Sequence, residues 1–267
     1  MAVFSGKFDT VVIILSTGRT GTMALAQYLD TCYEQVKGLH EPPPSRHLRI
    51  ASNRYLCGRV SKDDLVGIFA RSRRRLFEGI SEPIYVEANN FLHGFLDAFE
   101  EIFDAPRVVH VVRDPRTFIR SWINFGVFRG LKGLAGRYYP FWLLKPERYE
   151  KNPARRWSRM ARPERIAWYW NAINRELNRG QELFGQRYLR LRFEEIFAEE
   201  GSELSRLVRW MGLPERDQLL AQARKQRINP SRDAGFPPWQ QWDPGIQQSV
   251  LDLAGRLMTQ YGYDTVE

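Results

Sequence analysis

A short segment near the N-terminus combines the residue types that hold phosphate groups. Ser16-Thr-Gly-Arg-Thr-Gly-Thr22 is small and polar, and it contains two glycines and one arginine. It follows the apolar, β-branched run Thr10–Leu15 and precedes a helical spacing of apolar residues from Met23 to Leu29. A turn between a strand and a helix directs backbone N–H groups and the start of the helix at one point. The segment therefore predicts a phosphate site.

Each residue type in this turn has a chemical use. Gly18 and Gly21 let the backbone turn tightly and approach an oxygen closely. Arg19 adds a positive charge, and Thr20 and Thr22 add hydroxyl donors. The ATP-binding pattern GxxxxGK[ST] is incomplete, because a threonine stands where it has lysine and a serine where it has its first glycine. The pattern GxGxxG also fails. A strand-to-helix turn without a ligand is the alternative, and the coincidence of arginine, threonines and strand speaks against it.

A second polar group follows another buried run, Arg107–Val112. Arg113 stands at the carboxyl end of this predicted strand, where open α/β sheets bind ligands. Pro115 suits the first turn of a helix, and Ser121 lies eight residues after Arg113, about two helical turns away on the same face. An arginine and a serine so placed can hold a second phosphate that is not in line with the first. Taken alone, Arg-Asp-Pro is a common helix start.

Three residues at the ends of predicted strands are candidates for taking a proton from a reacting hydroxyl group. His40 and Glu41 follow the predicted strand Gln35–Leu39, which a run of three prolines terminates. Neighbours along an extended chain point in opposite directions, so we expect only one of the two to face the site. Glu87 ends the predicted strand that begins at Pro83. The alternative for each is a structural role, paired with one of the many arginines.

The elements that must position these residues predict an α/β fold. Strand-like runs alternate with helical patterns, which is typical of a central, mainly parallel sheet flanked by helices in three layers. We expect a single domain over residues 1–267, with an aromatic and basic insertion around 126–165 that packs over the site. The expected strands are Thr10–Leu15, Gln35–Leu39, Pro83–Glu87, Arg107–Val112 and Tyr188–Arg192, and further helices are expected over Lys62–Phe77, Phe91–Phe103, Glu203–Met211 and Gln247–Tyr261.

The composition is that of a globular protein with an affinity for anions. Hydrophobic residues make up 43% of the 267 residues, and the formal charge is +9, mostly from arginine. The planar guanidinium suits phosphate and sulfate oxygens, although a genome-level preference for arginine codons would give the same excess. No apolar run is long enough to span a membrane, and no secretory signal pattern is present. We therefore expect a cytoplasmic protein.

The cysteine and histidine positions do not indicate a metal site. Cys32 and Cys57 are too few for a disulfide scaffold or a structural zinc site, and we expect two free thiols, with one bridge left open. The four histidines show no metal-binding spacing. No metal is expected.

Together these segments resemble the sulfotransferase family, and its carbohydrate-modifying and bacterial members more than its cytosolic small-molecule members. In that family a modified phosphate turn, similar to Ser16–Met23, holds the 5′-phosphosulfate of 3′-phosphoadenosine 5′-phosphosulfate (PAPS). A segment similar to Val109–Trp122 holds the 3′-phosphate through its arginine and serine. Tyr188–Ile196 and Asn229–Trp239 are similar to C-terminal segments of the family, the latter to its cofactor-covering loop. The resemblance spans most of residues 10–263, except 45–80 and 126–165.

The resemblance implies a P-loop-like fold and assigns roles to individual residues. Arg19 stands where the family usually has lysine, and we expect it at the oxygen that bridges phosphate and sulfate. The family often has a hydroxyl residue at the position of Met23. Methionine has no hydroxyl group, so only its backbone N–H can bind the phosphate here. Glu41 is the first candidate for the general base, because a glutamate after this strand serves as base in the carbohydrate-modifying branch; His40 and then Glu87 follow. The expected cofactor-binding residues are Thr17, Gly18, Arg19, Thr20, Gly21, Thr22, Met23, Arg113, Ser121 and Arg232.

The expected reaction is transfer of a sulfuryl group from PAPS to a hydroxyl or amine by in-line displacement, without a metal, leaving adenosine 3′,5′-bisphosphate. The aromatic and basic stretch 126–165 indicates a glycan, glycolipid or other hydroxylated metabolite as acceptor, unless its aromatics only form the core of a lid. A nucleotide kinase and a non-catalytic polyanion-binding protein are the alternatives. The missing lysine speaks against the kinase, and no helix-turn-helix, zinc-finger or RNP-like motif indicates nucleic-acid binding. Peripheral membrane contact and the oligomeric state stay open.

Overall fold

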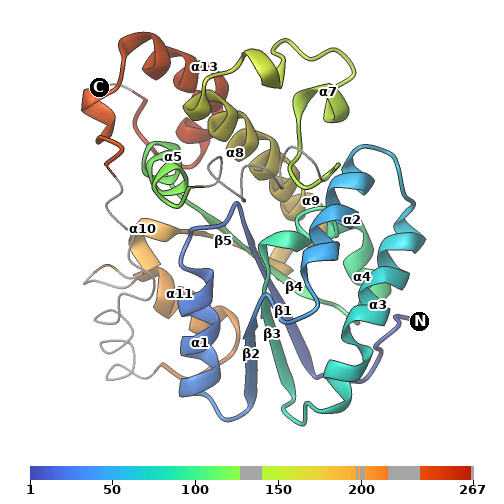
Figure 1. Ribbon diagram of the computed structural model, residues 1–267. Helices are drawn as coiled ribbons and strands as arrows, with labels where there is room; N and C mark the ends of the chain where they lie inside the picture. The colour runs from blue at the N-terminus through green and yellow to red at the C-terminus, as the bar shows by residue number, and fades with distance from the viewer. Residues whose placement is uncertain (127–139, 197, 199–201, 216–234, 266–267) are drawn as a thin grey trace.

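A five-stranded parallel sheet forms the centre of the computed structural model, which describes residues 1–126, 140–196, 198, 202–215 and 235–265 (Figure 1). The strands lie in the order β2-β3-β1-β4-β5, and each neighbouring pair is parallel. They are β1 (Thr10–Ser16), β2 (Val36–His40), β3 (Ile84–Ala88), β4 (Arg107–Val112) and β5 (Tyr188–Arg192). The predicted parallel α/β sheet is confirmed, with each strand within one residue of its expected bounds.

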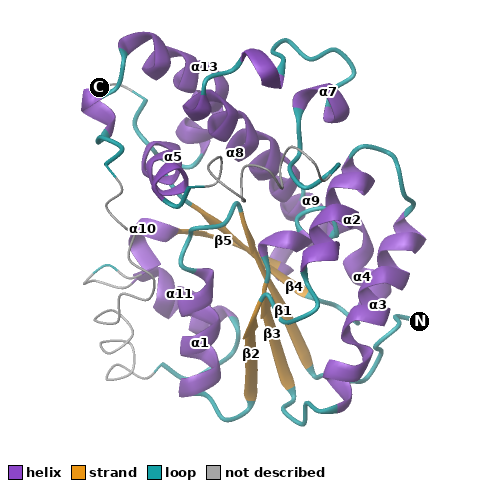
Figure 2. Cartoon of the chain, in the orientation of Figure 1, coloured by secondary structure: helices purple, strands orange, loops and turns teal. Residues whose placement is uncertain are grey.

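Helices cover both faces of this sheet and complete the expected three layers (Figure 2). On one face lie α1 (Thr22–Cys32) and α11 (Ser202–Trp210). On the other lie α2 (Arg46–Leu56), α3 (Lys62–Glu78), α4 (Phe99–Ile102), α5 (Pro115–Asn124), α8 (Arg162–Asn178) and α13 (Pro244–Gln260). The shorter α7 (Pro146–Tyr149), α9 (Gly180–Phe184) and α10 (Phe193–Ile196) complete the described helices. Among the residues that the structure describes, no helix is both long and apolar enough to cross a membrane.

The central strand β1 is buried on both faces because its side chains alternate between two apolar cores. Val12 and Ile14 pack with the α1 and α11 side chains, whereas Val11, Ile13 and Leu15 pack with the core on the opposite face. These five residues are the apolar run that the sequence analysis interpreted as a buried parallel strand. A strand fixed on both faces gives the turn that follows it a rigid base.

The topology places the ends of β1 and β4 beside each other. The chain leaves β1 toward β2 on one side of the sheet, and it leaves β4 toward β5 on the other. Such a reversal opens a crevice at the carboxyl ends of the two strands. Ser16, the last residue of β1, is in register with Val111 of β4. The phosphate turn after β1 and the segment starting at Arg113 after β4 are therefore neighbours.

The helix expected over Phe91–Phe103 is wrong for most of its length. The chain forms two 3₁₀ turns, Asn90–Leu92 and Leu96–Ala98, before the short α4. Gly94, between the two turns, lies so close to α2 that an added Cβ would be 2.7 Å from the Ser52 carbonyl oxygen. Close packing against α2 thus favours tight turns over the regular helix that the apolar spacing predicted.

Two helices that carry site residues have no counterpart among the expected elements. α2 lies in a region that the resemblance did not cover, and α8 begins within the expected insertion, at Arg162. α8 packs against β1, β4, α5 and α13, and most of its residues from Ile166 to Leu177 are buried. Residues 127–139 of the expected insertion lie outside the described part of the chain.

Candidate active site

The phosphate turn has a backbone shape that turns its amides toward a ligand. Gly18, Arg19 and Gly21 have φ angles of +89°, +57° and +71°, all in the left-handed region. Glycine adopts this region freely, whereas an arginine there is held by its surroundings, as happens at binding sites. Gly21 caps α1 without a side-chain hydrogen bond, so no capping side chain occupies the N–H groups of the first turn. This arrangement suits an anion at the helix start.

Hydrogen bonds inside the turn fix its shape. Ser16 Oγ accepts from the Gly18 backbone N–H at 3.0 Å and from Thr20 Oγ1 at 2.7 Å, and it donates to Asn90 Oδ1 at 2.5 Å. The hydroxyl of Thr20 therefore organises the turn in this structure. Thr17 and Thr22 are buried beside it, while Met23 is 38% exposed at the start of α1.

The arginine and serine after β4 meet the turn directly. Arg113 Nη1 donates to the Arg19 carbonyl oxygen at 2.6 Å, and Arg113 Nε donates to Thr117 Oγ1 at 3.0 Å. Its guanidinium lies 4.4 Å from the ring centroid of Phe193. Arg19 Nε donates to Ser121 Oγ at 3.3 Å, so the Arg19 side chain lies toward the second subsite. Burial lowers the pKa of both arginines, which stay cationic at neutral pH because guanidinium is a very weak acid.

Glu41 is linked to the same turn by Asn90, which hydrogen-bonds to both. Asn90 Nδ2 donates to Glu41 Oε1 at 3.2 Å, and Asn90 Oδ1 accepts from Ser16. The backbone of Glu41 has φ +43°, and its N–H donates to the Ala88 carbonyl oxygen, which fixes the residue at the end of the sheet. Burial raises the pKa of Glu41, and the Asn90 hydrogen bond and the charge of Arg49 oppose this rise. A carboxyl group with a raised pKa is a stronger base than an ordinary one.

His40, the last residue of β2, projects to the face of the strand opposite to that of its neighbour Leu39. Alternate residues of a strand share one face, so His40 lies on the same face as Gly38. Gly38 lies so close to α1 that an added Cβ would clash with the Ala26 carbonyl oxygen. Burial lowers the pKa of His40, so the imidazole is neutral at pH 7.

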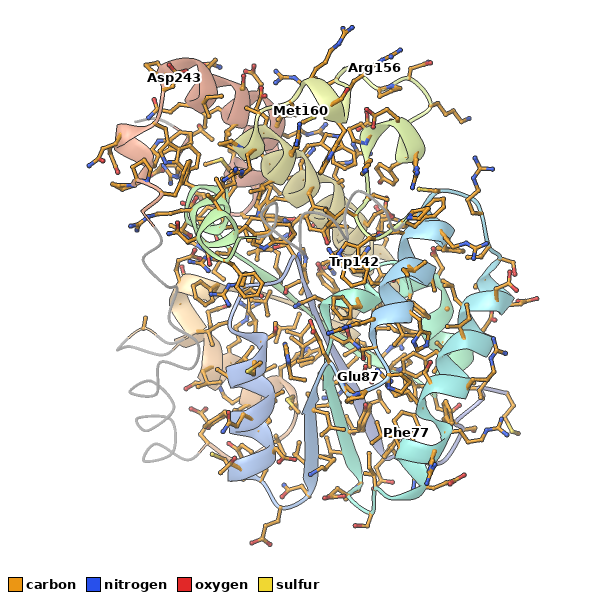
Figure 3. All side chains as sticks on the ribbon, in the orientation of Figure 1. Phe77, Glu87, Trp142, Arg156, Met160 and Asp243 are labelled. Atoms are coloured by element: carbon orange, nitrogen blue, oxygen red, sulfur yellow. The ribbon has the colours of Figure 1, made fainter. Side chains whose placement is uncertain are left out.

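Glu87 is enclosed in the core (Figure 3). Its Oε1 accepts from Arg73 Nη2 at 2.6 Å and Asn89 Nδ2 at 2.7 Å, and its Oε2 accepts from Arg73 Nε at 2.9 Å and Tyr85 hydroxyl at 2.6 Å. The side chain is 0% exposed. Four donors thus occupy both oxygens, and Glu87 has the structural role that was the alternative to a catalytic one.

Three residues that the sequence analysis did not single out complete the surroundings of Glu41. Asn90 comes three residues after the predicted strand Pro83–Glu87, and the rule that site residues follow strand ends would have indicated it. Arg49 of α2 lies between the Phe91 and Trp142 rings, 5.5 Å and 4.9 Å from their centroids. Burial raises the pKa of Tyr169 on α8, and the positive charge of the nearby Arg49 opposes that rise. No sequence motif marks Arg49 or Tyr169, because their proximity depends on how two unpredicted helices pack.

The remaining expectations concern Arg232 and metal binding. Arg232 lies outside the described residues. Within the described ranges, no group of three or more His, Cys, Asp or Glu residues is placed to hold a metal ion. Cys32 and Cys57 form no disulfide bond within those ranges.

Comparison with known proteins relates this geometry to one family. The family model described as "Sulfotransferase domain" matches residues 9–233. No curated protein matches the chain. Among solved structures, the sulfotransferase domain from the curacin biosynthetic pathway is 14% identical with a TM-score of 0.58, over 96% of this chain and 98% of that one. A sulfotransferase from Alicyclobacillus acidocaldarius is 14% identical (TM-score 0.53; 95% and 96% covered).

A mouse structure, sulfotransferase SULT7A1 complexed with PAP, is 11% identical with a TM-score of 0.54, over 95% of this chain and 89% of that one. At these identities the solved structures show a shared fold, which is the expected P-loop-like α/β fold. The family match covers most of the chain, including both phosphate-site segments and the strand that precedes Glu41. The chain therefore belongs to the sulfotransferase family and is a transferase of sulfuryl groups.

Proposed function

We propose that this enzyme transfers the sulfuryl group of PAPS to a hydroxyl or amine of an acceptor and leaves adenosine 3′,5′-bisphosphate. The observation that carries the proposal is the contact between the turn after β1 and the segment after β4. Arg113 donates to the Arg19 carbonyl oxygen, and Arg19 donates to Ser121. The two segments follow different strands and contact each other. Two neighbouring anion sites of this kind suit a nucleotide with separate 5′ and 3′ phosphate groups.

The residues of the site fit this donor chemically. The start of α1, which has no side-chain cap, and the left-handed Gly18 and Gly21 suit the 5′-phosphosulfate. Arg113 and Ser121 suit the 3′-phosphate, and the guanidinium can bind two phosphate oxygens at once. Thr17, Thr20, Thr22 and Met23 contribute backbone or hydroxyl groups of the turn, and Arg232 stays a predicted contact.

Arg19 and Glu41 supply the charge and the base of the proposed reaction. PAPS supplies a sulfuryl group on a phosphate leaving group, on whose bridging oxygen negative charge grows as the bond to sulfur breaks. Arg19 is the cation of the turn, and its proposed role is to stabilise that charge, as preorganised cations do in group transfer; for this role its side chain would turn from Ser121 toward the bridging oxygen. Glu41 takes the proton of the acceptor hydroxyl, whose oxygen forms the new bond to sulfur.

The choice of Glu41 over the other two candidates follows from their partners. Glu87 has four donors on its two oxygens and no exposure, so an acceptor cannot reach it. His40 shares the α1-side face of β2 with Gly38 by strand alternation. Glu41 alone of the three is linked to the phosphate turn, through Asn90, and has a pKa raised by burial.

The surroundings of Glu41 favour a glycan, a glycolipid or another hydroxylated metabolite as acceptor. Phe91, Trp142 and Tyr169 present aromatic groups around Arg49. Aromatic faces pack against the C–H groups of sugar rings, and a guanidinium can hydrogen-bond to hydroxyl or anionic oxygens. Trp142 comes from the stretch that was expected to contact the acceptor.

A screen with radiolabelled PAPS against pooled glycans, glycolipids and hydroxylated metabolites tests the activity. Calorimetry with adenosine 3′,5′-bisphosphate and with ATP tests the nucleotide site independently. We expect tight binding of the bisphosphate, weak or no binding of ATP, and label transfer to at least one pool. Binding of ATP alone would support the kinase alternative. Salt-sensitive binding to DNA without a response to either nucleotide would support a polyanion-binding protein.

A further inference from the structure

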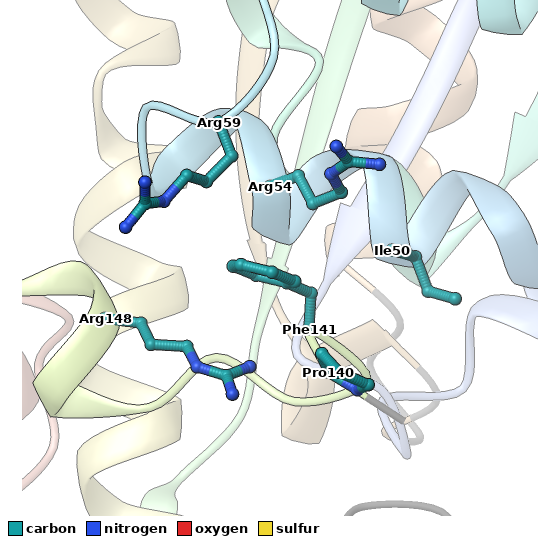
Figure 4. A pocket seen from close by; sticks show the side chains of 6 residues that line it. All are labelled: Ile50, Arg54, Arg59, Pro140, Phe141 and Arg148. Atoms are coloured by element: carbon teal, nitrogen blue, oxygen red, sulfur yellow. The ribbon is translucent and has the colours of Figure 1, made fainter. Parts of the chain in front are cut away.

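An open cavity on the acceptor side of the molecule is lined by three arginines. It has a volume of about 530 Å³, and its lining residues are Ile50, Arg54, Arg59, Pro140, Phe141 and Arg148. We call it the arginine pocket. Figure 4 shows α2 and its following turn on one side and the segment 140–148 on the other, with the Phe141 ring between them. The pocket is distinct from the phosphate turn, and no motif in the sequence indicated it.

Among the described residues, no carboxylate forms an ion pair with the three arginines of this pocket. Within the described residues, Arg54, Arg59 and Arg148 form no ion pair, whereas other exposed arginines such as Arg179 and Arg187 pair with aspartate or glutamate. The Arg148 guanidinium lies 4.7 Å from the Phe141 ring centroid. Three like charges around one cavity repel each other, so an anion bound between them would relieve that repulsion.

The nearby groups agree with this positive field. The charge of Arg54 helps to lower the pKa of Asp64. The Asp64 carboxylate does not pair with Arg54, because it accepts hydrogen bonds from the backbone N–H and the hydroxyl of Ser61 at 2.8 Å each. Burial raises the pKa of Cys57, and the charges of Arg148 and Arg59 oppose that rise. Two arginines from different segments thus act on the same point beside the pocket.

A series of close polar contacts joins the Phe141 backbone at the pocket to Glu41, and the neutral His93 ring in its middle donates one of its two contacts as a hydrogen bond. The Phe141 carbonyl oxygen accepts from Asn53 Nδ2 at 2.7 Å, and Asn53 Oδ1 lies 2.9 Å from His93 Nε2. His93 Nδ1 lies 2.9 Å from the Asn90 carbonyl oxygen, and Asn90 donates to Glu41. The wall of the pocket and the proposed base are therefore held in one frame.

Helix α2 connects the two places a second time. Arg49 lies beside Glu41, and Arg54 lies five residues later on the same helix, about 7.5 Å along its axis. Arg59 is held next to Arg54, because its backbone N–H donates to the Arg54 carbonyl oxygen at 2.8 Å. The same five residues turn the helix by about 140°, so an acceptor that reaches from Glu41 to the pocket passes around the side of α2 as well as along it.

We infer that the arginine pocket binds an oxyanion carried by the acceptor, a carboxylate, phosphate or sulfate group on a molecule whose hydroxyl lies at Glu41. The inference rests on the proposed function and narrows it, because it makes the acceptor an anionic compound. Guanidinium groups converging from two segments can each give paired hydrogen bonds to such a group. A neutral acceptor would leave the three charges unmatched.

Four probes with one sugar backbone test the inference: glucose, glucuronate, glucose 6-phosphate and glucose 6-sulfate. Each is titrated by ligand-observed NMR against the full chain saturated with adenosine 3′,5′-bisphosphate, which occupies the phosphate sites. The pocket variant Arg54→Gln/Arg59→Gln/Arg148→Gln is compared with Arg74→Gln/Arg75→Gln/Arg256→Gln. The control removes the same charge from exposed arginines on α3 and α13.

We expect at least one anionic probe to bind the wild type and the control alike, at least about tenfold more tightly than the pocket variant and than glucose. Which probe binds best identifies the oxyanion. Equal binding by the pocket variant, an equal loss in the control, or binding of glucose alone would overturn the inference. Thermal unfolding and bisphosphate affinity of the pocket variant show whether it is folded. Failure of the proposed function would instead appear as a wild type that does not bind the bisphosphate.

Discussion

Arg73 of α3 and Glu87 of β3 form a doubly hydrogen-bonded ion pair whose side chains are both 0% exposed. Arg73 Nη1 also donates to the Pro44 carbonyl oxygen at 3.1 Å, and Arg73 Nη2 donates to Ser45 Oγ at 2.9 Å. These two acceptors lie in the segment that follows Glu41. The pair therefore joins a helix and a strand to the chain that carries the proposed base.

Replacement of Arg73 by methionine should destabilise the fold strongly. It would leave the Glu87 carboxylate buried without a counter-charge, which costs about 3–5 kcal/mol when one partner of a buried pair is removed. Urea unfolding of the purified variant measures this loss. The double variant Arg73→Met/Glu87→Gln removes both charges and should recover a large part of it. A single variant that loses under about 1 kcal/mol would contradict the structural role assigned to this pair.

Glu41→Gln should abolish most turnover without weakening the nucleotide site. Glutamine keeps the shape and can still bond to Asn90, but it cannot accept a proton, so kcat should fall about 10²–10⁴-fold. Calorimetry with adenosine 3′,5′-bisphosphate should give an unchanged affinity. His40→Gln is the matched control from the adjacent position and should keep turnover within a few-fold. A reversed pattern, with Glu41→Gln active and His40→Gln inactive, would make His40 the base.

Arg113→Ala should weaken nucleotide binding rather than the chemical step. It removes the buried guanidinium that we assign to the 3′-phosphate, and a charge-assisted hydrogen bond contributes about 1.5–3 kcal/mol, which corresponds to roughly 10–150-fold in affinity. Adenosine 5′-phosphosulfate, which lacks the 3′-phosphate, should lose little affinity in the same variant. Arg74→Ala, on the exposed side of α3, is the control. Equal losses for both nucleotides would remove Arg113 from the 3′ subsite.

The sheet and the phosphate turn could be predicted from sequence because their signals are local. β1 is a continuous apolar run, and the turn that follows it concentrates glycine, threonine and arginine within a few residues. Arg113 was found by the same logic, since it directly follows the apolar strand β4. The carboxyl ends of neighbouring parallel strands lie side by side, so the proximity of residues at those ends follows from the topology alone.

The acceptor side could not be predicted because its contacts join segments far apart in the chain. Arg49 meets Trp142 and Tyr169 only after α2, the segment near 142 and α8 have packed together. The regular helix expected from Phe91 onward failed for a related reason: Gly94 is pressed against α2. A local apolar pattern carries no information about such an approach.

The pH dependence of turnover should report the environment of Glu41. Burial raises its pKa above the ordinary 4.5, and only the deprotonated form can act as base. Activity should therefore fall as the pH drops through a value above 4.5. Arg49 holds this pKa down through its positive charge, so Arg49→Gln should move the acid limb of the kcat profile to higher pH. Arg74→Gln removes an equal charge far from Glu41 and should leave the limb in place. A limb that moves to lower pH in Arg49→Gln, or moves equally in both variants, would mean that another group controls the acid side of the profile.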